Sequence, residues 1–321
     1  MSFSFAITAP SPHVPIADWV ERVRRLEAIG FDEVVMADHF TDGYDTEPMV
    51  GLTAAAMATD RLRLRPAVLG VDYRHPVLVH RMAATLDVVS EGRLTLGIGA
   101  GWMTSDYEAA GIDVDEPGVR VSRLGEAISV VKGLFGPAPF SFDGDHYLIR
   151  ELDGLPKPVQ LPYPPFFVGG GSPRVLRLAG REAAVVGVNA TLRAGVLGRH
   201  AIVDFTPERV HEKIGWVYEG AADAGKSPDD VTLSMNCWLV RVTPDTASAT
   251  EFLDRMAGQF DLTGRDLDAS PGVLVGTVDE ICAKLEASRR EYGFRHIQLD
   301  AGFHPKHLDS ITPIVTTLAG T

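Results

Sequence analysis

Residues 4–39 read SFAITAPSPHVPIADWVERVRRLEAIGFDEVVMADH, and the order of elements in this stretch decides the fold. The apolar runs 4–8 and 33–37 have the length and composition of short buried strands. Between them, apolar side chains recur at helical spacing from Ile16 to Ile29, and Gly30 follows as a stop. The stretch therefore predicts a strand, a helix and the strand of the next unit, which is the pattern of repeated βα units.

The same pattern continues along the chain. Six further strands are predicted at 62–69, 93–98, 165–168, 183–189, 231–242 and 296–299, with helical patterns between them. Two excursions interrupt the rhythm after strands four and six, at 136–164, where Asp143-Gly144 is a hairpin signal, and at 190–205. Eight strands alternating with helices favour a closed (β/α)8 TIM barrel, one α/β domain spanning 1–321, over an open doubly wound sheet. In either architecture the functional site lies where the strands end.

The composition limits the classes of partner. Asp and Glu number 43 against 30 Lys and Arg, a net charge of −13, which repels nucleic acid. A small anionic cofactor is still compatible, because backbone N–H groups can bind phosphate. No stretch approaches the roughly 18 apolar residues of a membrane helix, and no basic segment precedes an apolar run at the N-terminus, so we expect a cytoplasmic protein. Cys237 and Cys282 are expected to be small buried hydrophobes without a disulfide.

Polar or glycine residues follow the second and third predicted strands. Asp38-His39 ends strand two, where an adjacent carboxylate can fix the tautomer of an imidazole or favour its charged form. The alternative is that Asp38 caps a turn and His39 packs. Gly70 lies at the end of strand three, where it permits unusual backbone geometry beside a ligand or simply forms a bulge.

Two glycine-rich clusters follow the fourth and fifth strands. Gly97-Ile98-Gly99-Ala100-Gly101-Trp102 lacks the G-x-G-x-x-G spacing of a dinucleotide fingerprint and lies in mid-chain, but its glycines allow the backbone to approach a flat ring. Gly169-Gly170-Gly171 precedes Ser172-Pro173, an N-cap and first-turn pair. Free N–H groups at the positive end of a helix dipole suit a phosphate, whereas a flexible turn is the alternative.

Signals for metal or nucleophilic chemistry are weak. The chain contains no H-E-x-x-H and no G-x-S-x-G, and His304-x-x-His307 follows Gly302 in what we interpret as a surface loop. We therefore expect no metal site and do not favour a barrel hydrolase.

Taken together, these residues resemble the bacterial luciferase-like family of flavin and deazaflavin enzymes, over nearly the whole chain. The order and spacing of several motifs carry the resemblance. They are Gly30-Phe31-Asp32-Glu33 leading to Ala37-Asp38-His39-Phe40, His75-Pro76, Gly92-Arg93-Leu94, Gly97 to Trp102, Arg123-Leu124-x-Glu126, Val168 to Arg174, and Gly276-Thr277-x-Asp279-Glu280.

The resemblance implies a usually dimeric (β/α)8 barrel with reduced FMN or coenzyme F420, a deazaflavin, across the strand ends. It also implies a cis non-prolyl peptide after strand three, at Gly70–Val71 in this chain, and a catalytic pair, Asp38 and His39, near the reactive face. The cofactor is then expected to contact Asp38, Gly70, Val71, Ala100, Gly101, Trp102, Gly169, Gly170, Gly171 and Ser172.

Two departures from the family pattern affect the function. Sugar-phosphate dehydrogenases of the deazaflavin branch carry a glutamate where Trp102 stands, which argues against a sugar substrate, and relatives often have Asn where Met103 stands. The leading hypothesis is an F420-dependent oxidoreductase that transfers a hydride between the deazaflavin and a small organic substrate. The alternatives are a monooxygenase that uses FMNH2 and O2, and a non-catalytic flavin-binding protein.

Overall fold

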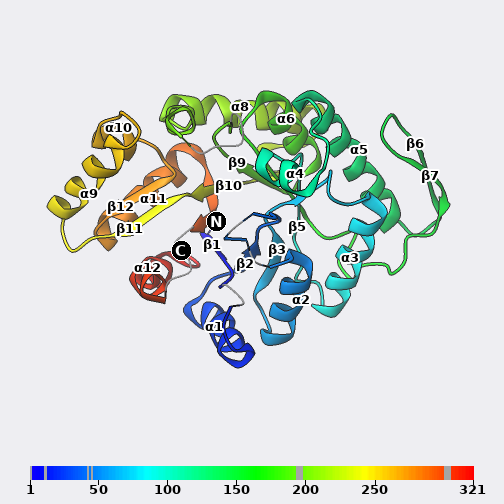
Figure 1. Ribbon diagram of the computed structural model, residues 1–321, viewed down its shortest axis with the longest axis horizontal. Helices are drawn as coiled ribbons and strands as arrows, with labels where there is room; N and C mark the ends of the chain where they lie inside the picture. Colours follow the sequence, from blue (N-terminus) through cyan, green and yellow to red (C-terminus); the bar gives the residue numbers. More distant parts are fainter. Residues whose placement is uncertain (1, 11–12, 42, 45, 193–197, 300–304) are drawn as a thin grey trace.

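Eight parallel strands form a ring at the centre of the computed structural model, and helices surround it (Figure 1). The structure describes residues 2–10, 13–41, 43–44, 46–192, 198–299 and 305–321. Hydrogen bonds between neighbouring strands run around the ring in the order of the chain. A bridge between Leu64 and Leu94 closes the ring. The predicted α/β barrel is therefore confirmed. Its strands are β1 (Ser4–Thr8), β2 (Glu33–Met36), β3 (Arg63–Pro66), β5 (Leu96–Gly99), β8 (Phe166–Gly170), β9 (Val185–Val188), β10 (Thr232–Cys237) and β13 (Phe294–Leu299).

The helices cover the outside of this ring. Several begin at a signal that is visible in the sequence, such as Thr277, whose hydroxyl forms a reciprocal capping box with Glu280. The helices are α1 (Ile16–Ile29), α2 (Pro48–Ala58), α3 (Pro76–Val89), α4 (Thr104–Ala110), α5 (Pro117–Phe135), α6 (Pro173–Glu182), α7 (Arg199–Val203), α8 (Pro207–Asp223), α9 (Thr246–Gly258), α10 (Gly264–Asp268), α11 (Val278–Tyr292) and α12 (Pro305–Leu318).

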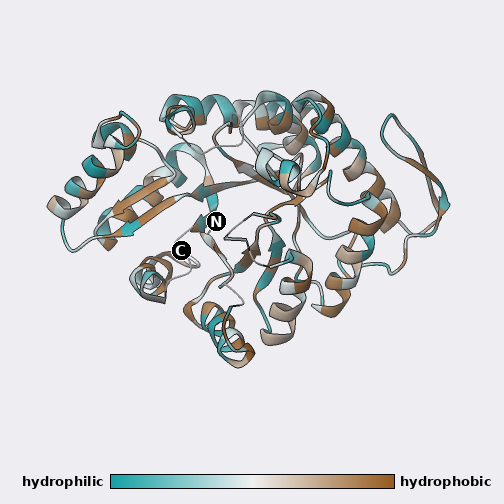
Figure 2. Ribbon diagram, viewed as in Figure 1, coloured by the Kyte–Doolittle hydropathy of each residue, from teal (hydrophilic) through white to brown (hydrophobic). Residues whose placement is uncertain are grey.

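Several elements differ from the sequence-based expectation. The third predicted strand is interrupted after Pro66, and β4 (Leu69–Gly70) continues it on the other side of a bulge. The seventh divides into β10 and β11 (Leu239–Val242), and β11 pairs with β12 (Val273–Gly276), an unpredicted strand, in an apolar pair beyond the ring (Figure 2). The first excursion holds the hairpin of β6 (Phe140–Asp143) and β7 (Leu148–Leu152) that Asp143-Gly144 indicates. The second includes α7, and its residues 193–197 lie outside the described part of the chain.

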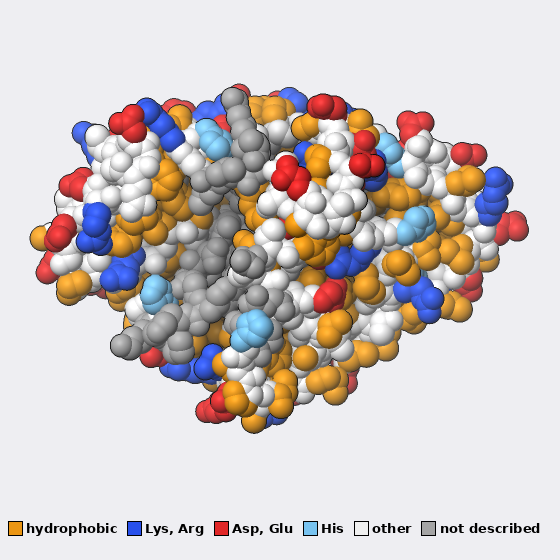
Figure 3. Space-filling view, viewed as in Figure 1, with side chains coloured by type: hydrophobic (Ala, Val, Ile, Leu, Met, Phe, Trp, Pro, Cys, Tyr) orange, Lys and Arg blue, Asp and Glu red, His pale blue; other side chains and the backbone are white. Residues whose placement is uncertain are grey.

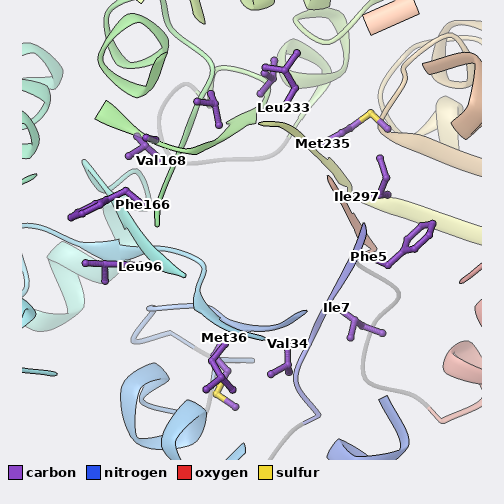
Figure 4. Packing of buried hydrophobic residues seen from close by; sticks show 14 of the residues in the cluster. Phe5, Ile7, Val34, Met36, Leu96, Phe166, Val168, Leu233, Met235 and Ile297 are labelled. Atoms are coloured by element: carbon purple, nitrogen blue, oxygen red, sulfur yellow. The ribbon is translucent and has the colours of Figure 1, made fainter. Parts of the chain in front are cut away.

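The outer face of the ring is apolar. In Figure 4, alternate residues of the strands, such as Phe5 and Ile7 on β1 or Val34 and Met36 on β2, point outward toward the helices. This alternation follows from the two-residue period of a strand, and it sends the residues between them into the ring. The outward set therefore forms the main core between the ring and the helices.

The inside of the ring is polar, unlike that of most barrels, where branched aliphatic side chains fill the layers. Arg65 is 1% exposed, and its guanidinium donates to Glu33 at 2.5 Å and to Gln298 at 2.9 Å. His296 lies 3.2 Å from Glu33 through Nε2 and 2.8 Å from the hydroxyl of Ser234 through Nδ1. The network satisfies its buried charges with one another, as burial requires.

Two expectations concern the chain as a whole. Cys237 and Cys282 are both buried and form no disulfide, as predicted. Within the part of the chain that the structure describes, no helix combines the length and apolarity needed to cross a membrane.

Candidate active site

The residue clusters singled out in the sequence lie at the carboxyl ends of the ring strands. Asp38 and His39 follow β2, Gly70 ends β4, and Ala100 follows β5. Pairing places β4 beside β5, and β5 beside β8, which leads into Gly171. One rim of the barrel therefore carries all four clusters, as the topology of parallel strands requires.

Asp38 is a structural anchor of this rim. Its buried carboxylate accepts the N–H of Gly70 at 2.9 Å and two bonds from the guanidinium of Arg74, at 2.6 and 2.9 Å. Arg74 also donates to Glu47 at 2.8 Å. Burial lowers the pKa of Arg74, but the hydrogen bonds and charges of Asp38 and Glu47 outweigh it and raise the pKa overall. The oxygens of Asp38 are thus engaged in holding the loop after β4.

His39 takes a different partner from the expected one. Its Nδ1 lies 2.5 Å from Oδ2 of Asp106 on α4, so the expectation that Asp38 orients His39 is wrong. Asp106 is fully buried and also accepts the N–H of Phe40 at 3.0 Å. Burial raises the pKa of Asp106, but the hydrogen bonds from His39 and from the Phe40 N–H outweigh it and leave that pKa lowered. Asp106 could not be singled out from the sequence, because α4 was not predicted and a lone Asp there carries no signal.

Aromatic rings surround His39. The centroid of its imidazole lies 4.4 Å from that of Tyr44 and 5.4 Å from that of Trp102, the latter edge to face. The His39 side chain is 11% exposed, and its Nε2 makes no hydrogen bond with a residue that the structure describes. One ring nitrogen is therefore fixed by a carboxylate, while the other remains for a bound molecule, as in an acid–base catalyst.

The bulge between β3 and β4 contains a cis peptide bond at Ala67–Val68 rather than at Gly70–Val71 as expected. Val71 donates its N–H to Gly99 at 3.1 Å, so its backbone belongs to the β4–β5 pairing. A Cβ on Gly99 would approach Cγ2 of Val68 to 2.5 Å, and one on Gly97 would collide with the carbonyl oxygen of Pro66. The Gly-x-Gly pattern is thus required by the bulge that packs over it.

A second set of contacts fastens the segment after β5. Arg120 on α5 donates to the carbonyls of Ala100 at 3.2 Å and Gly101 at 2.6 Å. Gly101 has φ +72°, and a side chain on it would collide with the hydroxyl of Tyr107. That hydroxyl donates to Asp72 at 2.7 Å, which links the loop after β4 to α4. Arg120 therefore holds Ala100 and Gly101 by their carbonyls, and the next residue, Trp102, lies beside His39.

The segment Gly169 to Ser172 joins β8 to α6 in a close backbone approach. Gly170 accepts the N–H of Asn189 at 2.9 Å, and a Cβ on Gly171 would lie 2.5 Å from the nitrogen of Thr191. Ser172 occupies the N-cap position, as predicted, but its side chain makes no capping bond. Its hydroxyl and the first N–H groups of α6 therefore remain unsatisfied by the helix itself.

A metal site was not expected from the sequence. Among the described residues, no group of three His, Cys, Asp or Glu side chains is arranged to hold a metal ion. His304, part of the weak His-x-x-His pattern, lies outside the described residues.

The ring of parallel strands with its polar and glycine-rich ends at one rim defines a (β/α)8 barrel of the enzyme type. Within that class, the chain belongs to the luciferase-like monooxygenase family, whose model matches residues 1–260. This is the family that the sequence motifs indicate, a group of flavin- and deazaflavin-dependent oxidoreductases.

Curated relatives divide between the two cofactors. An F420-dependent glucose-6-phosphate dehydrogenase of Microbacterium testaceum is 28% identical over 232 residues, which cover 70% of this chain and 64% of that protein. An FMNH2-dependent dimethylsulfone monooxygenase of Pseudomonas putida is 31% identical over 159 residues, 48% of this chain and 44% of that protein. The chain thus spans about half to two thirds of the length of the curated relatives that it matches.

Solved structures align over almost the entire chain and share its fold. The F420-dependent tetrahydromethanopterin reductase of Methanopyrus kandleri has a TM-score of 0.78 at 20% identity, covering 99% of each chain. An F420-dependent secondary alcohol dehydrogenase with an F420-acetone adduct has a TM-score of 0.79 at 22% identity, covering 99% of this chain and 98% of that one. A long-chain alkane monooxygenase reaches 0.79 at 14% identity, covering 99% and 91%.

Proposed function

We propose that the protein is a coenzyme F420-dependent oxidoreductase acting on a small organic substrate. The observation that carries the proposal is the His39–Asp106 dyad: an imidazole held by a buried carboxylate at 2.5 Å, beside Trp102, at the rim where a barrel binds its ligands. In its bound state the deazaflavin supplies the hydride chemistry. His39 exchanges a proton with the substrate oxygen, and Asp106 keeps the imidazole oriented.

Two features of the rim fit a cofactor with an anionic tail and a polar ring. The N–H groups of Gly171 and Ser172 donate to no residue that the structure describes, and they precede the start of α6. They would hold a phosphate group of the cofactor. Across the barrel, the amide oxygen of Asn236 on β10 is buried and has no hydrogen-bond partner among the described residues, so a ligand N–H or hydroxyl would satisfy it.

The surroundings of His39 favour an uncharged substrate. Trp102 and Tyr44 contribute aromatic surface, while Arg74 is engaged by Asp38 and Glu47. The presence of Trp102 in place of the glutamate of sugar-phosphate dehydrogenases is consistent with an alcohol or a carbonyl compound rather than a sugar phosphate.

The second candidate is a monooxygenase using FMNH2 and O2, which the match to the dimethylsulfone monooxygenase supports. Titration of the purified protein with F420 and with FMN, each oxidised and reduced, followed by fluorescence, separates the two. We expect F420 to bind in the micromolar range or tighter and FMN to bind more weakly. Tight binding of FMN with no response to F420 would instead establish the flavin alternative.

The third candidate is a protein that binds a flavin without catalysis. Turnover in a screen of alcohols and carbonyl compounds with bound cofactor, abolished in His39→Ala, would exclude it. A screen with no turnover for the wild type and unchanged cofactor affinity in the variant would favour it.

We further infer that the protein forms a homodimer through α2, α3 and the segment after β7. These elements expose large apolar side chains, among them Met57 (72% exposed), Leu78 (53%) and Leu161 (88%). Figure 3 shows hydrophobic side chains gathered on the side of the molecule where α2 and α3 lie. Surface of this kind is typical of a protein–protein interface. Light scattering should give a dimer for the wild type and for Val203→Glu on α7, and a monomer for Met57→Glu with Leu78→Glu. A monomeric wild type would refute the inference.

A further inference from the structure

A fully buried ammonium lies behind the glycine-rich segment of the rim. Lys213 on α8 has no exposed side-chain surface, and its Nζ donates to the carbonyl of Gly171 at 2.5 Å and to Asp204 at 2.8 Å. The hydroxyl of Thr191 lies 3.5 Å away. The three protons of the ammonium are thus directed at groups of the protein, and none is left for a ligand.

Asp204 extends this contact to the segment after β9. Its Oδ2 also accepts the N–H of Thr191 at 2.8 Å, and its Oδ1 accepts Arg209. Burial lowers the pKa of Lys213, and the carboxylate of Asp204 opposes that effect. We refer to Lys213, Asp204, Thr191 and Gly171 as the lysine clamp. It joins α8, the segment after β9 and the segment after β8 at a single buried charge.

Glycines permit the close packing that brings Lys213 to this place. A Cβ on Gly180 of α6 would collide with the carbonyl of Val217 on α8, and one on Gly220 of α8 would collide with that of Arg177 on α6. The two helices therefore approach backbone to backbone. Any larger residue at these positions would push α8, and with it Lys213, away from Gly171.

Contacts to the carbonyls of Gly170 and Gly171 determine where two N–H groups point. In a planar trans peptide the C=O and N–H bonds are antiparallel. Because the carbonyl of Gly171 is turned inward to Lys213, the N–H of Ser172 is turned away from α8. Because the carbonyl of Gly170 accepts the N–H of Asn189, the N–H of Gly171 is turned away from β9. Neither N–H has an acceptor among the described residues, so both remain available to a ligand.

We propose that Lys213 is a positioning residue that selects a phosphorylated cofactor, by holding the Gly171–Ser172 peptide with the N–H of Ser172 toward the phosphate. This inference rests on the proposed function, in which the N–H groups of Gly171 and Ser172 hold that phosphate. Lys213 itself touches no ligand. Without it, the Gly171–Ser172 peptide can rotate, and the N–H of Ser172 loses the orientation that phosphate binding requires.

The experiment compares each cofactor with its phosphate-free counterpart. Dissociation constants are measured by fluorescence for FMN and riboflavin, and for F420 and its deazaflavin nucleoside, on the 321-residue chain. We expect Lys213→Met to reduce the preference for the phosphorylated form by at least about tenfold, the contribution typical of a charge-assisted hydrogen bond. The affinity for the phosphate-free form should change by less than about threefold, because the substitution does not alter the part of the site that binds the flavin or deazaflavin ring.

A matched control is available on the same side of the barrel. Lys226 also donates to carbonyls, those of Gly180 at 3.3 Å and Ala183 at 3.0 Å, but at the opposite end of β9. Lys226→Met should leave the preference unchanged. Since Lys213→Met leaves the carboxylate of Asp204 without its ammonium, the double variant with Asp204→Asn is measured as well, and the same loss of preference is expected from it.

The outcomes separate the two levels of the proposal. A wild type that binds both forms of its cofactor equally would refute the phosphate site of the proposed function. A wild type that prefers the phosphorylated form, together with folded Lys213 variants that retain this preference, would overturn the role of Lys213 alone. An equal loss in Lys226→Met would also overturn it, because the effect would then come from general destabilisation.

Discussion

The carboxylates of Asp38 and Asp106 both lie near the end of β2, but they have different roles because their hydrogen-bond partners differ. Asp38 is occupied by a bidentate guanidinium and a backbone N–H, so it serves the structure of the loop after β4. Asp106 holds an imidazole whose other nitrogen has no partner among the described residues. Adjacency in sequence suggested the pair Asp38–His39, whereas adjacent side chains after a strand point in different directions.

This difference predicts distinct effects of two isosteric substitutions. Asp106→Asn removes the charge that orients His39 and should lower kcat/KM by about 100-fold, within the range of acid–base catalysis. Cofactor affinity should stay within about threefold. Asp38→Asn should instead lower Tm and weaken cofactor binding, because Arg74 then loses its buried charged partner and keeps only the exposed carboxylate of Glu47. Steady-state kinetics with a substrate found in the wild-type screen, together with thermal unfolding, tests both. Equal kinetic defects without a difference in Tm would contradict this division of roles.

At the scale of the elements, the bulge between β3 and β4 explains the glycines of β5. Val68 packs over Gly99, and the backbone of Pro66 lies over Gly97, so β5 can carry no side chain at these inward positions. Two features that look independent in the sequence, an interrupted strand and a Gly-x-Gly pattern 30 residues later, are therefore two halves of one packing arrangement.

The two glycines should respond differently to a compensating change. Gly99→Ala should lower the free energy of unfolding by about 1–3 kcal/mol, the usual cost of overpacking. Val68→Ala removes the methyl group at 2.5 Å and leaves Cβ at 3.7 Å, so the double variant should recover most of the loss. Gly97→Ala should not recover, because its obstacle is backbone. Urea unfolding measures both single glycine variants and both double variants, and rescue of Gly97→Ala by Val68→Ala would refute this account.

At the scale of the whole molecule, the polar interior of the barrel links stability to pH. Burial raises the pKa of Glu33, but the charges and hydrogen bonds of Arg65 and His296 outweigh it and bring that pKa to about 2, against an ordinary 4.5. A carboxyl group with a lowered pKa stabilises the folded state fully above its unfolded value. That contribution is lost as the pH falls from about 4.5 to about 2.

The contribution of Glu33 to the pH dependence of stability can be tested with Glu33→Gln, alone and together with Arg65→Met. The wild type should lose about 3 kcal/mol of unfolding free energy from Glu33 across this window. Glu33→Gln alone should be destabilised at pH 7 by about 3–5 kcal/mol, because Arg65 is left buried without its partner. The double variant Glu33→Gln with Arg65→Met should regain stability and show a shallower acid dependence. Urea unfolding from pH 2.5 to 7 provides the measurement, and an unchanged acid dependence in the double variant would contradict the assignment.

The sequence by itself determined the barrel and the positions of its rim clusters. Strands, helices and the cap at Thr277 are encoded by local periodicity and by short signals, so they are readable without the fold. The exceptions have physical reasons. The helix α2 (PMVGLTAAAMA) is apolar on nearly every side and shows no periodicity, while α4 and β12 are too short to display one.

Only the tertiary structure decided the partners of the charged groups. His39 meets Asp106 across 67 positions, Lys213 meets Gly171 across 42, and Glu33 meets His296 across 263. Periodicity carries no information about such pairs, because they depend on which elements the closed ring brings side by side. Closure of the ring therefore converted a set of strand ends into a site, with Asp106 rather than Asp38 beside the imidazole.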